Sequence, residues 1–299
     1  MGDAPPERAE GHGQGLQKFM NRVISTHVIV NHRLTTAWLD KASHAGVSAV
    51  EIFCARQHFD YRNKSQAAEL GHWFRDSDMK LHALHSPMYT DEIWGRSGPD
   101  THVNITEKVK GERIRWVDEI KRALEVAEIV PFRYLVQHLG VGGQEFSEHA
   151  IEAAFSSLEE LTVFARQRGV EILLENTLNE FSSAERLKYF NDVTHLRLNY
   201  VFDTGHAHIG AGIAHEFEIM KDRIRSLHVH DNNGKDDQHL FPMAEGGTID
   251  WTRTMELLKS RADQYPLLLE LREVPEMQNP LSEIARVFDA LEALEPTNV

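Results

Sequence analysis

The sequence predicts a single (β/α)8 TIM barrel of class α/β. Short apolar or β-branched runs alternate eight times with longer amphipathic segments, which is the pattern of parallel strands joined by helical crossovers. The chain has 299 residues, and such a barrel needs about 250. A doubly wound open sheet is the rival architecture. It requires a Gly-rich phosphate turn after its first strand, and THVIVNHRLT contains no glycine.

Each strand is expected where an apolar run of suitable length occurs. In chain order these runs cover residues 23–30, 47–54, 80–87, 132–140, 171–177, 196–205, 223–232 and 266–272. The helices are expected at residues 35–46, 65–77, 107–129, 147–168, 251–262 and 282–294, with shorter segments after the fifth and sixth strands. Ser147 is a suitable N-cap and Gly169 a suitable C-cap for the fourth helix. We therefore expect one barrel domain over residues 21–299.

The N-terminal residues, the lengths of the apolar runs and the cysteine content bear on the cellular location of the protein. Residues 1–20 are polar and rich in Gly and Pro, without the apolar stretch of a secretion signal, and are expected to form a flexible tail. No apolar run approaches the ~20 residues that span a bilayer. Cys54 is the single cysteine, so an internal disulfide is excluded. These features predict a cytoplasmic protein that does not enter a membrane.

The charge balance bears on the partners of the protein. Lys and Arg total 32 against 46 for Asp and Glu, which gives a formal net charge of -14. Such a field repels polyanions and disfavours a broad nucleic-acid-binding face. A small molecule is therefore the expected partner, and homo-oligomerisation stays open.

Carboxylates and imidazoles recur where the predicted strands end. Glu175, Asp203, His228 and Glu270 occupy such positions in EILLEN, YVFDTGH, LHVHD and LLLELR. In a (β/α)8 barrel these strand ends meet at one face, and several converging carboxylates are tolerated chiefly around a cation or shared protons. Oxygen and imidazole donors suit Mn2+, Zn2+, Co2+ or Mg2+. Any one of these residues could be a hydrogen-bonded core residue, but the recurrence predicts a divalent metal site.

These motifs resemble those of a known superfamily. LLENT, FDTGHAH, LHVHDN and LLLELR are similar to the metal-site motifs of the xylose isomerase-like barrels, over about residues 23–294. That superfamily includes ketose 3-epimerases, inosose dehydratases, hydroxypyruvate isomerases and the endonuclease IV group (AP endonuclease family 2). The resemblance to the epimerases implies one ion held by Glu175, Asp203, His228 and Glu270.

The endonuclease IV group implies a larger set of ligands. It holds three zinc ions, and the further matching positions here are His85, His138, His206, Asp237 and His239. Two motifs depart from that group, because this chain has HLG in place of HPG and DTGH in place of DTCH. In sugar-isomerase-like members, such histidines often bind substrate hydroxyls. The five residues are therefore candidates either for further metals or for substrate.

The function expected from the resemblance is a divalent-metal-dependent sugar, or sugar-phosphate, isomerase or epimerase. The ion would acidify the C–H next to a carbonyl and stabilise the enediolate, while Glu175 and Glu270 move the proton. The expected substrate contacts are His85, His206, Trp94, Lys235 and Arg272. Dehydration of a keto-inositol by the same chemistry is not separated from epimerisation. The alternatives are an endonuclease IV-like multi-zinc phosphodiesterase and a non-catalytic sugar-binding barrel.

Three further features of the sequence leave their roles open. His230 alternates with His228 on one strand and so shares its face; we expect it to lie behind the metal ligands or to contact substrate. Glu51, in AVEIF, fits either a structural ion pair or a substrate contact. The long loop at residues 88–104 carries Tyr89, Trp94 and Arg96 and is either a lid or a packed surface loop.

Overall fold

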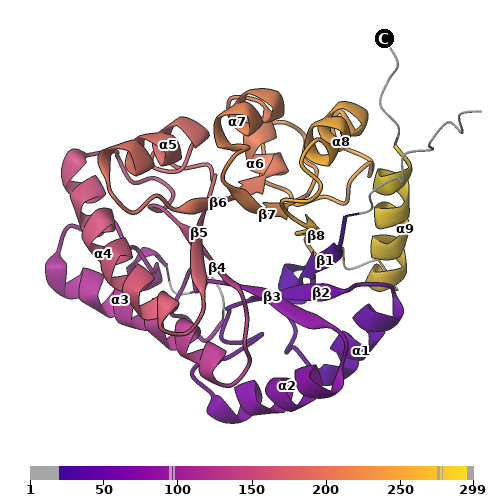
Figure 1. Cartoon of the computed structure of the whole chain (residues 1–299), viewed down its shortest axis with the longest axis horizontal. Coiled ribbons are helices and arrows are strands. Elements are labelled where there is room, and N and C mark those ends of the chain that lie inside the picture. The colour runs from indigo at the N-terminus through magenta and orange to yellow at the C-terminus, as the bar shows by residue number, and fades with distance from the viewer. Residues whose placement is uncertain (1–19, 94–95, 97, 275–276, 278, 295–299) are drawn as a thin grey trace, which may run out of the picture.

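Eight parallel strands form one sheet that curves into a barrel with helices around it (Figure 1). The computed structural model describes residues 20–93, 96, 98–274, 277 and 279–294. The predicted tail lies outside this part of the chain except for Met20, which packs into the core. The strands are β1 (Arg22–Ser25), β2 (Ala49–Phe53), β3 (Lys80–His85), β4 (Tyr134–His138), β5 (Glu171–Glu175), β6 (Asn199–Asp203), β7 (Ile224–His228) and β8 (Leu267–Leu269).

The order of the strands follows the chain, with closure between the last two. The sheet runs β7-β6-β5-β4-β3-β2-β1-β8. Between β7 and β8 there is a single parallel bridge, Val229 to Leu269. The amide of Val229 donates to the carbonyl of Leu268 at 2.9 Å, and the amide of Glu270 donates to the carbonyl of Val229 at 3.2 Å. The barrel is thus nearly closed, and the predicted (β/α)8 fold is confirmed.

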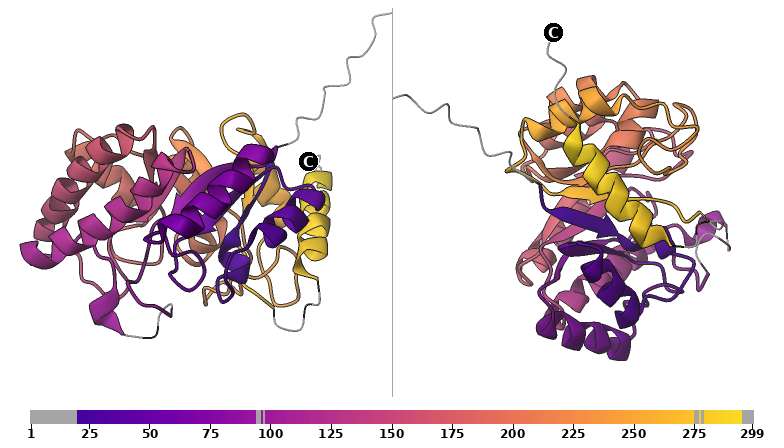
Figure 2. Two further views of the ribbon diagram at one scale, coloured as in Figure 1. Left: turned by 90° about the horizontal axis from the view of Figure 1, so that it is seen from below. Right: turned by 90° about the vertical axis from the view of Figure 1, so that its right-hand side faces the viewer.

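Helices connect the strands and cover the outside of the barrel. They are α1 (Thr36–His44), α2 (Lys64–Asp76), α3 (Lys110–Glu125), α4 (Glu148–Arg166), α5 (Ala184–Val193), α6 (Thr204–Ile209), α7 (Ile213–Met220), α8 (Trp251–Lys259) and α9 (Pro280–Ala293), with 3-10 turns η1 (Thr26–Ile29), η2 (Pro99–Thr101) and η3 (Val126–Glu128). Figure 2 shows that the loops after β3 and after β8 extend on the same side of the barrel. No helix in the described ranges is long and apolar enough to cross a membrane.

Several predicted boundaries differ from the structure by a few residues, and two of them show a local cause. The first strand was expected over residues 23–30 but ends at Ser25, because the Ser25 hydroxyl accepts a hydrogen bond from the amide of His27 and caps the turn η1. Ser147 caps α4 as predicted, accepting from the amide of Ala150 at 3.3 Å. The C-cap of α4 is Gln167, not Gly169. Gly169 instead makes the turn that follows, with φ of 73°.

The inside of the barrel is filled by a small apolar cluster directly beneath the strand ends. It consists of Ala83, Tyr134, Val136, Leu173 and Val201, all at most 3% exposed. Side chains two residues apart on a strand share a face. Four of these residues therefore lie two positions before a polar strand-end residue, in the pairs Ala83 and His85, Val136 and His138, Leu173 and Glu175, and Val201 and Asp203. The apolar cluster forms the floor, and the polar residues lie above it at the mouth.

A buried histidine in the loop after β2 gives the fold a specific pH dependence. His58 is fully buried, and its Nδ1 donates to the carbonyl of His32 at 2.6 Å while its Nε2 accepts from the Thr26 hydroxyl at 2.8 Å. Burial lowers the pKa of His58 from 6.5 to about 4. Between pH 6.5 and pH 4, the unfolded chain therefore binds a proton at this residue that the folded chain does not bind. The contribution of His58 to the free energy of unfolding is at its full value above pH 6.5. It falls by about 3 kcal/mol as the pH drops to 4.

We expect His58→Asn to remove this part of the pH dependence. Asparagine can still donate to the His32 carbonyl but does not titrate. The measurement is the free energy of unfolding by denaturant at several pH values between 4 and 7, for the variant and the wild type. His44→Asn is the matched control, because His44 is an exposed histidine at the end of α1. Parallel pH curves for His58→Asn and the wild type would contradict the assignment.

Candidate active site

Four buried residues converge at the carboxyl ends of consecutive strands. Glu175, Asp203 and His228 are the last residues of β5, β6 and β7, and Glu270 directly follows β8. Each side chain has a potential ligand atom within 4.8 Å of those of the other three. The sequence predicted this grouping, and the structure brings the four residues together.

The imidazole of His228 lies at the centre of this group. Its Nδ1 is 3.0 Å from Glu175 Oε1, 3.3 Å from Glu270 Oε2 and 3.9 Å from Asp203 Oδ2. This buried nitrogen has no hydrogen-bond partner among the described residues. Its Nε2 lies 3.1 Å from Glu51 Oε1, which accepts its proton. In the neutral ring, Nδ1 would then present its lone pair to three carboxylates, an arrangement that fits a divalent cation between them.

Glu51 acts through His228 and does not reach the mouth. It is the middle residue of β2 and is completely buried. Both of its oxygens lie within 3.3 Å of His228 Nε2. Of the two roles that the sequence left open, the structure shows the ion pair. A carboxylate behind a ligating histidine fixes the ring and its tautomer and raises its basicity.

The two glutamates experience opposite electrostatic environments. Burial acts to raise the pKa of Glu175, but His228 and His138 together hold that pKa well below its ordinary value. The pKa of Glu270 is raised, chiefly because burial disfavours its charged form. The pKa of His228 is raised well above 6.5 in spite of burial, because Glu270, Glu175 and Glu51 surround it. The group therefore concentrates negative charge in a site closed to solvent.

Glu175 is shared with a second group that contains two histidines. His85 and His138 end β3 and β4, and their Nε2 atoms lie 3.5 and 3.0 Å from Glu175 Oε2. The Nδ1 of His85 is bonded to the carbonyl of Ser86 at 3.0 Å, so its Nε2 is directed at the carboxylate. These three residues form a second potential metal group.

A third group lies on the other side of Asp203. It joins His206 of α6 to Asp237 and His239 in the loop after β7, and it also includes His230. The Nε2 atoms of His206 and His239 each lie 3.3 Å from Asp237 Oδ2. All five additional ligand candidates are thus brought beside the first four residues. His230 was expected behind the ligands or against substrate, and its alternation with His228 was the signal that could have placed it among the potential ligands.

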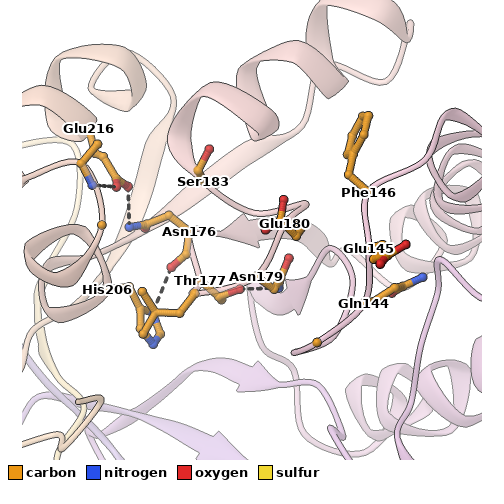
Figure 3. A pocket seen from close by; sticks show the side chains of 14 residues that line it. Gln144, Glu145, Phe146, Asn176, Thr177, Asn179, Glu180, Ser183, His206 and Glu216 are labelled. Carbon is orange, nitrogen blue, oxygen red and sulfur yellow. Dashed lines mark hydrogen bonds between the residues drawn. The ribbon is translucent and has the colours of Figure 1, made fainter. Parts of the chain in front are cut away.

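Asn176 holds several of these residues and was not singled out from the sequence. Its side-chain oxygen accepts from the amide of Asp203 at 2.7 Å, and its side-chain nitrogen donates to the carbonyl of Asp203 and to Glu216. Its backbone carbonyl lies 2.9 Å from His206 Nδ1. Figure 3 shows Asn176 between Glu216 and the His206 ring at the wall of a cavity of about 680 Å³. Its position directly after Glu175 in LLENT was the sequence signal that could have identified it as a site residue.

A smaller cavity of about 290 Å³ opens directly over the histidines. Its lining includes His138, His206 and Asp237, the uncharged polar side chains of Gln137 and Asn179, and Tyr89 and His102 of the loop after β3. Tyr89 and His102 pair as an antiparallel bridge and their rings lie 4.6 Å apart, so the two arms of that loop meet above the site. No Lys or Arg among the described residues lines this cavity.

The remaining predicted substrate contacts are less well placed. Lys235 and Arg272 are exposed, and neither lines the two cavities beside the site. Trp94 lies outside the described residues. His85 is buried at 2% exposure beneath Phe53, whose ring stacks on it at 4.5 Å. His206 lines both cavities and is the predicted contact with the most direct access to a ligand.

Comparison with known proteins identifies the family. The chain matches the xylose isomerase-like TIM barrel family over residues 39–294. The uncharacterized protein MJ1311 of Methanocaldococcus jannaschii is 28% identical over 250 residues, 79% of this chain and 78% of that protein. A D-tagatose 3-epimerase-like protein superposes with a TM-score of 0.71 at 24% identity and covers 91% of this chain and 97% of its own. The IOLI protein with a zinc atom superposes with a TM-score of 0.66 at 18% identity, covering 91% and 96%. The chain belongs to the xylose isomerase-like TIM barrel family.

Proposed function

We propose that this protein is a divalent-metal-dependent isomerase or epimerase of an uncharged sugar. The observation that carries the proposal is the buried group in which Glu175, Asp203 and Glu270 surround the unpartnered Nδ1 of His228. These four residues would hold the ion. The description of one structural relative as a D-tagatose 3-epimerase-like protein, and the zinc atom held by another, accord with this assignment.

The chemistry of the site divides between the ion and the two glutamates. A divalent ion bound here would polarise a carbonyl oxygen of the substrate and acidify the neighbouring C–H. The carboxylate of Glu270 would take that proton as the C–H bond breaks and its electron pair moves toward the carbonyl oxygen. Glu175, after taking up a proton from solvent, would deliver it to the opposite face of the same carbon, which inverts it, and Glu270 would release its proton to solvent. Return to the adjacent carbon, with transfer of the hydroxyl proton, would give the isomer instead.

The cavity above the site favours a neutral sugar over a sugar phosphate. Its volume of about 290 Å³ is at the lower end for a ligand pocket. Gln137 and Asn179 offer amide donors and acceptors that suit hydroxyl groups. A phosphate would call for Arg, Lys or a helix N-terminus directed at it, and none of the described residues lining this cavity is basic.

The test is exchange of a carbon-bound hydrogen with solvent. The metal-loaded protein is incubated in D2O with a panel of free ketoses and keto-glycosides, and deuterium incorporation is followed by NMR or mass spectrometry. We expect one position next to a carbonyl to exchange, the exchange to stop after chelation, and a divalent ion to restore it. Absence of exchange across the panel, with the metal shown to be bound, would overturn the proposal.

A second candidate function is a multi-zinc phosphodiesterase of the endonuclease IV type. The observation that favours it is the presence of two further potential metal groups, one of which shares Glu175 with the proposed site. The net charge of -14 works against a DNA-binding face. Three ions per chain, together with metal-dependent cleavage of duplex DNA at an abasic site, would replace the isomerase proposal. Ions at both further groups would distinguish this function from the isomerase, for which we propose the ion at the Glu175, Asp203, His228 and Glu270 group.

A further inference from the structure

A larger cavity adjoins the cavity that opens over the histidines, and we call it the side cavity. Its volume is about 680 Å³, against about 290 Å³ for the cavity over the histidines. The rest of its lining comes from the loop after β4, the start of α5 and the corner between α6 and α7. The two cavities share the lining residues Thr177, Leu178, Asn179 and His206. One ligand can therefore occupy both cavities at once.

Buried hydrogen bonds fix the wall of the side cavity that faces the barrel. Asn176 and Glu216 line this wall and are 1% and 3% exposed. Glu216 Oε2 accepts from the side-chain nitrogen of Asn176 at 3.2 Å (Figure 3), and Oε1 accepts from the amide of Ala211 at 3.1 Å. A Cβ added at Gly210 would lie 2.6 Å from Glu216 Oε1, so a side chain there would displace the carboxylate. The side cavity is therefore preformed, as ligand sites usually are.

A hydrogen-bonded turn lies where the two cavities meet. The amide of Thr177 donates to the carbonyl of Ser182 at 3.1 Å, and the side-chain oxygen of Asn179 accepts from the amide of Phe181 at 2.8 Å. Leu178 belongs to this turn, is 43% exposed and lines both cavities. A ligand that extends from one cavity into the other would cover this apolar side chain, which favours binding.

The charged groups of the side cavity are acidic. Glu145 and Glu180 are exposed and make no hydrogen bond or ion pair with another described residue. No Lys or Arg lines the cavity within the described ranges. Arg186 packs its guanidinium on the Phe146 ring, 3.8 Å from the centroid, and is not part of the lining. Carboxylates accept hydrogen bonds from hydroxyl groups and repel anions. The lining therefore fits a hydroxyl-bearing group without negative charge.

We propose that the side cavity binds a second, uncharged sugar ring. The substrate is then a sugar with a free carbonyl that carries this ring through a glycosidic bond. The inference rests on the proposed function, because it places the reacting ring in the cavity over the histidines. The glycosidic bond passes Leu178, and hydroxyl groups of the second ring donate to Glu145 and Glu180. This bond is neither made nor broken, so the chemistry at the reacting ring is unchanged.

The test compares the binding of fructose with that of disaccharides in which glucose is linked to O3, O4 or O6 of fructose. All keep the free carbonyl and differ in the position of the second ring. Calorimetry on the metal-loaded protein gives the dissociation constants, and saturation-transfer NMR shows which ring contacts the protein. We expect one disaccharide to bind about 10-fold more tightly than fructose, the effect of one added hydrogen bond to a charged group. Equal or weaker binding of all three disaccharides would overturn the proposal.

Filling the side cavity should remove the preference for the disaccharide. Ala211 is exposed and lines only this cavity, and tryptophan at its position keeps the amide that donates to Glu216. We expect Ala211→Trp to lose the preference and to bind fructose as the wild type does. Ala214→Trp is the matched control, because Ala214 is exposed on α7 and lines neither cavity. A preference that survives Ala211→Trp would contradict the assignment.

Removing the two exposed carboxylates tests the charge argument. The double variant Glu145→Ala, Glu180→Ala should bind the preferred disaccharide about 10-fold more weakly and bind fructose unchanged. Glu152→Ala is the control, because Glu152 is exposed on α4 outside the cavity. A disaccharide with a uronic acid as its second ring should bind the wild type more weakly than the neutral disaccharide. Tighter binding of the uronic acid would refute the assignment to an uncharged ring.

These binding measurements are separate from the test of the proposed reaction. Deuterium exchange is not read out in any of them. If the disaccharide preference is present but no sugar exchanges, only the reaction is refuted. If fructose exchanges and the disaccharides show no preference, only the second ring is refuted.

Discussion

We expect replacement of Glu270 by glutamine to lower metal-dependent proton exchange at the substrate carbon by about 10²–10⁴-fold. Glutamine matches glutamate in shape and keeps one oxygen that can face the ion, but it cannot accept a proton. Glu270 is only 3% exposed and its pKa is raised by burial, so no solvent base has ready access to replace it. The measurement is deuterium incorporation per active site, with the bound metal quantified in the same sample.

The matched control for Glu270 lies three residues further along the same segment. Glu273 pairs with His32 on the surface at 2.7 Å, and Glu273→Gln should leave exchange unchanged. If Glu270→Gln retains its metal and loses exchange, the carboxylate acts as the base. Undiminished exchange in that variant would remove Glu270 from this role and leave it as a ligand at most.

We expect replacement of Glu51 by glutamine to weaken metal binding at the Glu175 group by about 10–100-fold, the range found for partners behind a ligating histidine. Glu51 does not touch the proposed ion. It accepts the proton of His228 Nε2 and thereby keeps the lone pair of Nδ1 directed at the three carboxylates. A neutral amide would hold the ring less firmly and make Nδ1 a weaker donor. The dissociation constant is measured by competition with a chelator of known affinity.

Glu119→Gln controls for the general cost of removing a buried carboxylate. Glu119 lies on α3 outside the three potential metal groups, is 2% exposed, and pairs with Arg122 of the same helix and with Arg62, which precedes α2. Both variants should lower the melting temperature of the metal-free protein. Only Glu51→Gln should change the metal dissociation constant. Equal metal affinity in Glu51→Gln and the wild type would show that Glu51 merely balances charge.

The sequence by itself determined the barrel and the positions of the candidate ligands along it. Alternation of strand and helix is a local property of the chain, and the predicted strands and helices match the structure apart from boundaries such as the early end of β1. Because side chains two apart share a face, the polar residues in EILLE, NYVFD and IRSLH all project above the inner apolar cluster. The rim carrying Glu175, Asp203 and His228 follows from this periodicity.

Only the tertiary structure decided which atoms face one another. Glu51 and His228 are 177 residues apart, and their contact depends on the relative stagger of β2 and β7 across the barrel. The ring of His230 fits only because Gly205 on α6 has no side chain. That contact exists because the closed barrel packs α6 against the residues that follow β7. The sharing of Glu175 between two potential metal groups follows in the same way. Periodicity encodes the face on which a side chain lies, but distances between strands are set by barrel closure and packing, which no local pattern specifies.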